Sequence, residues 1–175
     1  MSKFILFFSF VFVSISTYSG EFSDYKKRLE SNKDKLLLGL ESSLEKVTSS
    51  GNNNLKNTEL FKLKVSLVSI LKEVILEGDK GWCTGTELGN PMAYAFKGKR
   101  RISFCQALFN TLEIFGLVID EHKQDLIMQN VILHESLHIA NFSHSSEMYK
   151  VHNEILKDIG IENTFDLNGP VSYTH

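Results

Sequence analysis

The spacing of apolar residues predicts that the chain begins with helices. Between residues 22 and 47, apolar side chains recur every three to four positions among many lysines and glutamates. This pattern is typical of one long amphipathic helix, and a break near Asn32 is the alternative. The next ten residues, 48–57, are rich in serine, glycine and asparagine and therefore predict a flexible connection.

A second helix is expected to begin after Thr58, which is a suitable N-cap, and to continue to Glu77. Gly78 would end this helix, because glycine adopts the backbone conformation that a helix stop requires. One face of the helix is apolar and should contribute to the core, namely Leu60, Leu63, Leu67, Ile70, Leu71 and Val74.

The pattern changes to that of short strands after residue 81. The segments MAYAF (92–96) and RISFC (101–105) flank KGKR, which predicts a β-hairpin with Gly98 in its turn. Two more helices are expected, from residue 120 or 121 to about 140 and from 145 to 159, the last ended by Gly160. The predicted fold class is therefore α+β, with a helical first half and a small hairpin-bearing second half.

The first twenty residues, MSKFILFFSFVFVSISTYSG, have the pattern of a secretory signal peptide. One lysine precedes an apolar run of about 12 residues, which is shorter than the roughly 20 that a membrane span needs. We expect cleavage between Ser16 and Gly20, and an uncleaved N-terminal anchor is the alternative. The expected location is secreted or periplasmic, with no stable membrane anchor after signal removal.

Charge, length and cysteine content indicate which partners, how many domains and which covalent link to expect. The chain has 19 basic and 21 acidic residues and a net charge of −2, so a nucleic-acid partner is not expected. Its length of 175 residues suits one domain with a single core. The two cysteines, Cys83 and Cys105, would form a disulfide in an exported chain, and two free thiols are the alternative.

Candidate chemistry concentrates in the segment HESLHIANFSH, residues 134–144. His134 and His138 lie one helical turn apart on one face, so both can direct a ring nitrogen to the same ion. Glu135 is rotated by about 100° from His134 and would lie beside an open coordination position without being a ligand. This HExxH arrangement favours zinc, with Glu135 as the general base toward a zinc-bound water.

The third metal ligand is expected from the residues that follow the helix. His144 can return to the ion only if the helix ends before it. Asn141 is well suited to that end, because asparagine tolerates the left-handed backbone conformation. Three imidazoles and one water are an accepted catalytic zinc coordination.

These residues support a family resemblance. HESLHIANFSH resembles the motif of the zincin metallopeptidases, and its third-histidine spacing is similar to the metzincin pattern HExxHxxGxxH, with Asn141 in place of glycine. Over residues 83–152, AYAFKGKRRISFCQALF followed by NVILHESLH is similar to the deuterolysin-type (aspzincin) metalloendopeptidases. That family takes its third ligand from the aspartate of GTxDxxYG, which aligns with Glu147, although the GT is absent here. Glu147 is thus the alternative to His144.

The resemblance implies a zincin-like metallopeptidase domain over residues 58–175, after a signal peptide (1–19) and an N-terminal helix with its connection (20–57). It implies a zinc cofactor and a peptide or protein substrate. Tyr149 or Tyr173 could donate to the developing oxyanion, and the MAYAF strand could pair with extended substrate. A non-enzymatic exported binding module with a structural or vestigial metal site is the alternative function. Whether residues 21–57 are a pro-segment stays open.

Overall fold

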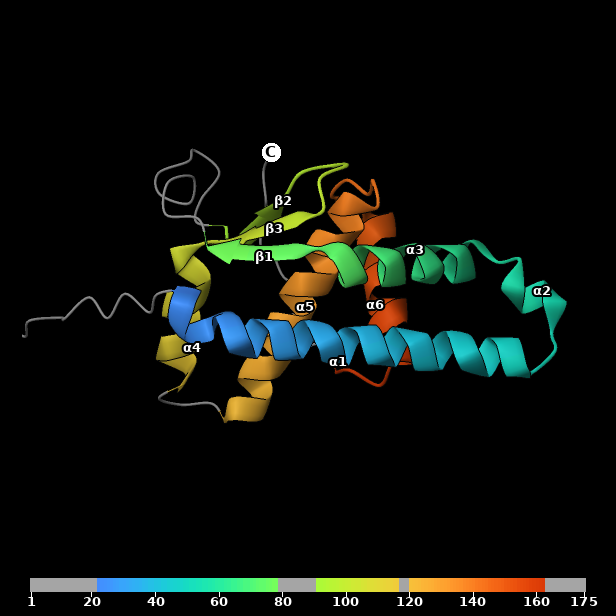
Figure 1. Ribbon diagram of the computed structural model, residues 1–175, viewed down its shortest axis with the longest axis horizontal. Coiled ribbons are helices and arrows are strands. Elements are labelled where there is room, and N and C mark those ends of the chain that lie inside the picture. The colour runs from blue at the N-terminus through green and yellow to red at the C-terminus, as the bar shows by residue number, and fades with distance from the viewer. Residues whose placement is uncertain (1–21, 79–90, 117–119, 163–175) are drawn as a thin grey trace, which may run out of the picture.

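The computed structural model describes residues 22–78, 91–116 and 120–162, which form six helices and one three-stranded mixed sheet (Figure 1). The predicted α+β class is confirmed in a mostly helical form. The helices are α1 (Phe22–Ser49), α2 (Asn53–Lys56), α3 (Glu59–Glu73), α4 (Gln106–Gly116), α5 (Glu121–Ile139) and α6 (Ser146–Asp158). The strands are β1 (Ile75–Gly78), β2 (Ala93–Ala95) and β3 (Arg101–Phe104). Within these described ranges, no helix combines the length and apolar content that crossing a bilayer requires. The predicted signal peptide lies outside them.

Helix α1 is continuous, so the alternative of a break near Asn32 is wrong. The Asn32 side chain is fully buried and bonds to α5: its amide donates to Asp125 Oδ1 at 3.0 Å, and its Oδ1 accepts from Gln129 Nε2 at 2.7 Å. Arg28 and Lys35 form ion pairs with the same Asp125 carboxylate. Burial alone would raise the pKa of Asp125, but the hydrogen bonds from Lys35, Asn32 and Arg28 outweigh it and lower the pKa. Polar contacts therefore join α1 to α5.

The connection after α1 contains the short helix α2. Helix α3 then begins after Thr58, its predicted N-cap, whose side chain accepts from the Phe61 backbone N–H. The predicted end of this helix is wrong. Helix α3 stops at Glu73, and residues 75–78 form strand β1 instead. Strand β1 pairs in parallel with β3, in the register Leu76 opposite Ile102. This distant pairing provides the backbone hydrogen bonds that a longer helix would otherwise have made.

The predicted hairpin is confirmed. Strands β2 and β3 are antiparallel, and Gly98 in their turn has a φ of 74°, the conformation that favours glycine. The sheet order is β1-β3-β2, so β2 is an edge among the described strands. Cys105 follows β3, is buried and is disulfide-bonded. Its predicted partner Cys83 lies outside the described residues, so the pairing itself stays a prediction.

Helix α5 runs through the middle of the molecule. In Figure 1 it crosses behind α1 and ends near the sheet and α6, and it packs against α1, α3, α4, α6 and β2. Because neighbours surround it, α5 buries polar residues as well as apolar ones, among them Gln129, Asn130 and Glu135. Its N-cap is Asp120, which accepts from the Lys123 amide, as the predicted start requires. Helix α4, which precedes it, was not predicted.

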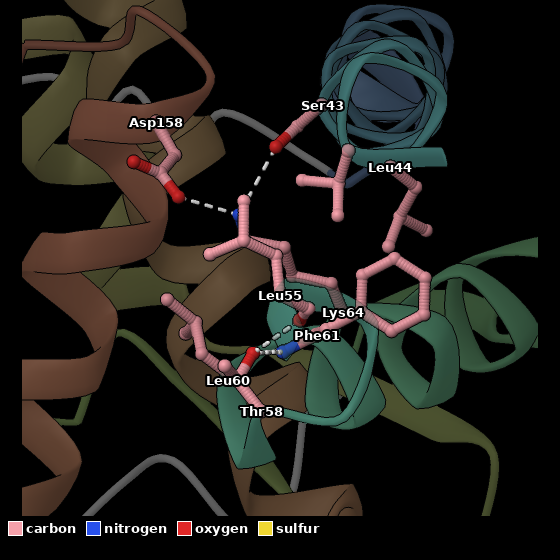
Figure 2. A pocket seen from close by; sticks show the side chains of 9 residues that line it. Ser43, Leu44, Leu55, Thr58, Leu60, Phe61, Lys64 and Asp158 are labelled. Atoms are coloured by element: carbon pink, nitrogen blue, oxygen red, sulfur yellow. Dashed lines mark hydrogen bonds and ion pairs between the residues drawn. The ribbon is translucent and has the colours of Figure 1, made fainter. Parts of the chain in front are cut away.

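A cavity of about 120 Å³ lies between the ends of α1, α3 and α6, beside α2 (Figure 2). Its walls are mainly apolar, but the Lys64 side chain is buried there. The ammonium group of Lys64 donates to Ser43 Oγ at 3.0 Å and forms an ion pair with the Asp158 carboxylate, as the dashed lines in Figure 2 show. The buried charge is therefore satisfied by the chain itself.

Candidate metal centre

The end of α5 directs the chain back toward its own histidines. Asn141 has a φ of 75°, the left-handed conformation that was predicted for it. The backbone N–H of Asn141 donates to the His138 carbonyl, and the backbone N–H of Phe142 donates to the Leu137 carbonyl. Two carbonyls at the helix end are therefore hydrogen-bonded. Ser145 then caps α6 by accepting from the Met148 amide at 3.2 Å. His144 lies between these two helix ends and is held close to α5.

The three predicted histidines meet at one point. His144 Nε2 lies 3.1 Å from His134 Nε2 and 3.2 Å from His138 Nε2. All three ligand atoms lie within 4.8 Å of one another. Ligands at 2.0–2.1 Å from a tetrahedral zinc ion are about 3.3 Å apart. The observed spacing is therefore close to the one that a tetrahedral ion requires, and this group could hold a metal.

Two of the rings, those of His138 and His134, have the protonation that metal binding requires. His138 Nδ1 lies 2.8 Å from the Phe142 carbonyl, which can only accept, so Nδ1 carries the proton and Nε2 presents a lone pair. Burial, followed by the neighbouring His138, His152 and His144, lowers the pKa of His134 to about 2. His134 is therefore a neutral imidazole at physiological pH, which is the form that binds metal ions.

Three buried side-chain polar atoms of residues near His134 have no hydrogen-bond partner. They are Oδ1 of Asn130, one helical turn before His134, Oε2 of Glu135, and Nδ1 of His152. Folded proteins leave few such atoms unbonded, and each one indicates strain, a functional role or a missing ligand. Asn130 and Glu135 are within one helical turn of His134, and the His152 ring packs near it, so these atoms are consistent with a site built for an ion and its water. The donor set and these orphaned atoms both fit a metal.

Glu135 faces the sheet. Its side chain is 6% exposed, and the backbone N–H of Ala95, the last residue of β2, donates to its carboxylate. Burial raises the pKa of Glu135 to about 8, although the Ala95 hydrogen bond opposes this shift. A carboxyl group with a pKa near neutrality can both take and return a proton, which is the property of a general acid–base catalyst.

His152 is a buried neighbour of the site that the sequence analysis did not single out. It is 1% exposed, its Nε2 lies 3.2 Å from the Asn130 carbonyl, and its ring centroid is 6.0 Å from that of His134. Burial lowers the pKa of His152. The signal was available, because Met148, His152 and Ile155 share one helical face with the spacing of core residues.

Helix α6 also carries the alternative metal ligand and a candidate oxyanion donor, and only the second of these lies near the histidines. Glu147, the alternative third ligand, is exposed in the first turn of α6 and does not belong to the histidine group. The ring of Tyr149 is near the group, with centroids 6.0 Å from His134 and 6.3 Å from His144. Tyr173 lies outside the described residues.

No protein-family model, curated protein or solved structure matches this chain. What is established is therefore the local finding: His134, His138 and His144, brought together by α5 and the turn that follows it, form a group able to hold a metal ion.

Proposed function

We propose that the protein is an exported zinc-dependent metalloendopeptidase of the zincin type. The observation that carries this proposal is the convergence of three imidazole nitrogens beside a buried glutamate that has one unpartnered oxygen. A purely structural zinc site normally uses four protein ligands, whereas a catalytic site uses three and leaves one position to water. The described residues offer three such ligands. The apolar N-terminal segment supports export.

Zinc is the metal that this donor set suits best. Imidazole nitrogens bind zinc, copper, nickel and iron, but a compact group of three at tetrahedral spacing, without a thiolate or carboxylate, favours zinc with one open position. His134, His138 and His144 would hold the ion. When bound, zinc supplies Lewis-acid polarisation of a carbonyl and lowers the pKa of its water.

The residues of the chain would then carry the proton movements. Glu135 would accept the proton of the attacking water at Oε2, the oxygen that has no partner in the protein. The Ala95 N–H would hold the carboxylate in place while Glu135 returns the proton to the leaving amine nitrogen. Tyr149, whose ring is near His134 and His144, is the candidate donor to the developing oxyanion.

The edge strand β2 is the proposed binding surface for an extended peptide. It is the outer strand of the described sheet, and its last residue bonds to Glu135. A peptide that added a strand along β2 would bring its backbone to the metal group through main-chain hydrogen bonds. A proline at Ala93 or Ala95 should then lower peptide cleavage.

One observation favours the alternative of a binding module with a structural metal. Glu135 is only 6% exposed, and a catalytic base has to meet its water and substrate. If strand β2 never moved away from Glu135, the group would bind a metal without catalysis.

The deciding experiment combines metal analysis with peptide cleavage, for the wild type and for Glu135→Gln. This change keeps the size of the side chain and removes its basicity. We expect one zinc per chain in both proteins and a loss of kcat of about 10²–10⁴-fold in the variant. Zinc retained by both proteins, with cleavage absent from both, would instead support the binding module.

A further inference from the structure

The turn that joins β2 to β3 gathers positive charge. The turn residues KGKR (97–100) and Arg101, the first residue of β3, include four basic residues, all of them exposed. Arg100 and Arg101 are already used within the fold, since they form ion pairs with Glu73 and Glu77. Lys97 and Lys99 have no carboxylate partner among the described residues.

One of these two lysines, Lys99, contacts an exposed aromatic ring. Phe96, which is 47% exposed, lies under the Lys99 ammonium, with 5.3 Å between the nitrogen and the ring centroid. The Tyr94 and Phe96 rings also form a T-shaped pair, with 5.4 Å between centroids. These contacts place the Lys99 ammonium over the Phe96 ring at the start of the turn.

This turn lies next to the proposed catalytic residues. Ala95 bonds to Glu135, and Lys97 follows only two residues later, about 7 Å further along at the rise of an extended chain. In Figure 1 the β2–β3 turn extends toward the end of α5 and the start of α6, where the histidines lie. A peptide extended along β2 and cleaved beside Glu135 would therefore pass Lys97 about two residues from its scissile bond. Lys99 lies across the turn from Lys97, because its backbone N–H donates to the Phe96 carbonyl at 2.9 Å.

We propose that Lys97 and Lys99 select substrates with acidic side chains two to four residues from the cleaved bond. This inference rests on the proposed peptidase function and adds a substrate class to it. Exposed ion pairs are individually weak, so two of them should favour glutamate over glutamine by roughly threefold to tenfold in kcat/KM. Lysine at the same substrate position should be disfavoured, because like charges repel.

An anionic membrane surface is the competing partner for a basic turn with an exposed ring. Surface recognition of acidic lipids usually takes clusters of four to eight basic residues, whereas this turn offers two unpaired ones. The direct link through Ala95 to Glu135 also has no function in a membrane contact. The observations therefore favour a peptide.

The test uses the zinc-loaded protein and a set of peptides that share one cleavable core. Glutamate, glutamine or lysine is placed two, three or four residues from the cleaved bond, on either side. The variant Lys97→Glu/Lys99→Glu reverses the charge of the turn. The control Lys26→Glu/Lys46→Glu makes the same change in net charge on exposed positions of α1. Peptide binding is measured separately by fluorescence anisotropy with the Glu135→Gln protein, at low and high salt.

We expect the glutamate preference in the wild type and in the α1 control, its loss or inversion in the turn variant, and its weakening at high salt. Cleavage or binding that is equal for glutamate and lysine peptides would overturn the inference. Binding to phosphatidylserine vesicles that depends on Lys97 and Lys99, without any peptide charge preference, would overturn it as well. If the wild type cleaves no peptide, the proposed function fails, and the anisotropy measurements still decide the charge preference.

Discussion

Two buried polar regions lie at opposite ends of α6, and they differ in whether their polar atoms have partners within the chain. At the end of α6, the Lys64 ammonium has the Ser43 hydroxyl and the Asp158 carboxylate as partners. Before the start of α6, three imidazole nitrogens converge, and Asn130 Oδ1 and Glu135 Oε2 have no partner. The two ends of this helix are about 18 Å apart. The first region is complete within the chain, whereas the second combines unpartnered polar atoms with a group that could hold a metal ion.

Mutations in the two regions should therefore differ in whether they affect the stability of the fold or the binding of a ligand. A buried group with partners in the chain costs stability when one partner is removed, because the other is left unpaired. A mutation in a site that binds a ligand should instead lower the affinity for the ligand, with little effect on the stability of the ligand-free protein. The following changes test this difference.

The largest effect is expected from His144→Ala. Removing one of three ligands should weaken zinc binding by about 10³-fold, which is about 4 kcal/mol. Glu147→Ala, a change in the exposed alternative ligand three residues later, should leave zinc affinity within about twofold, as expected for a surface side chain. Competition with a chromophoric chelator measures both affinities. The reverse order would make Glu147 the third ligand.

A smaller effect on the same region is expected from Asn130→Leu. The buried Oδ1 of Asn130 has no partner, and Asn130 lies one helical turn before His134. We expect this oxygen to accept a hydrogen bond from the second ring nitrogen of His134 when a metal is bound. Loss of such an outer contact typically costs 10–100-fold in metal affinity. Asn130→Asp keeps an acceptor and should retain most of the affinity. Equal zinc affinity in the wild type and the leucine variant would exclude this role.

The smallest effect is expected in the Lys64 region. Asp158→Ala leaves the buried ammonium with Ser43 alone, but the carboxylate is 44% exposed, so the loss should be about 1–2 kcal/mol in the free energy of unfolding. Urea denaturation measures it, with the exposed Glu154→Ala on the same helix as control. Zinc affinity should not change. A change in zinc affinity together with stability would show that the two regions are coupled.

The local parts of the site followed from the sequence. The HExxH spacing, the left-handed Asn141 and the return of His144 all depend on residues within one helix end and its turn, and the structure agrees with them. The cap residues Thr58, Asp120 and Ser145 were predictable for the same reason, since a cap bonds to amides two or three residues away.

The parts that depended on distant contacts were missed. Residues 74–78 continue the apolar pattern of α3, and only their pairing with β3 makes them a strand. Helix α4 has few polar residues to reveal its period. Likewise, the contact of Glu135 with Ala95 joins two segments 40 residues apart, and no spacing within either segment predicts it.

The packing of α1 has a consequence for how the protein can mature. Leu29, Leu36 and Leu40 are fully buried, and three such leucines contribute roughly 5–9 kcal/mol. Asn32 adds bonds to α5 from the same helix. This contribution is comparable to the whole net stability of a typical domain, about 5–15 kcal/mol. Proteolytic removal of residues 21–57 would therefore unfold the protein, so latency by a detachable inhibitory segment would have to involve another part of the chain.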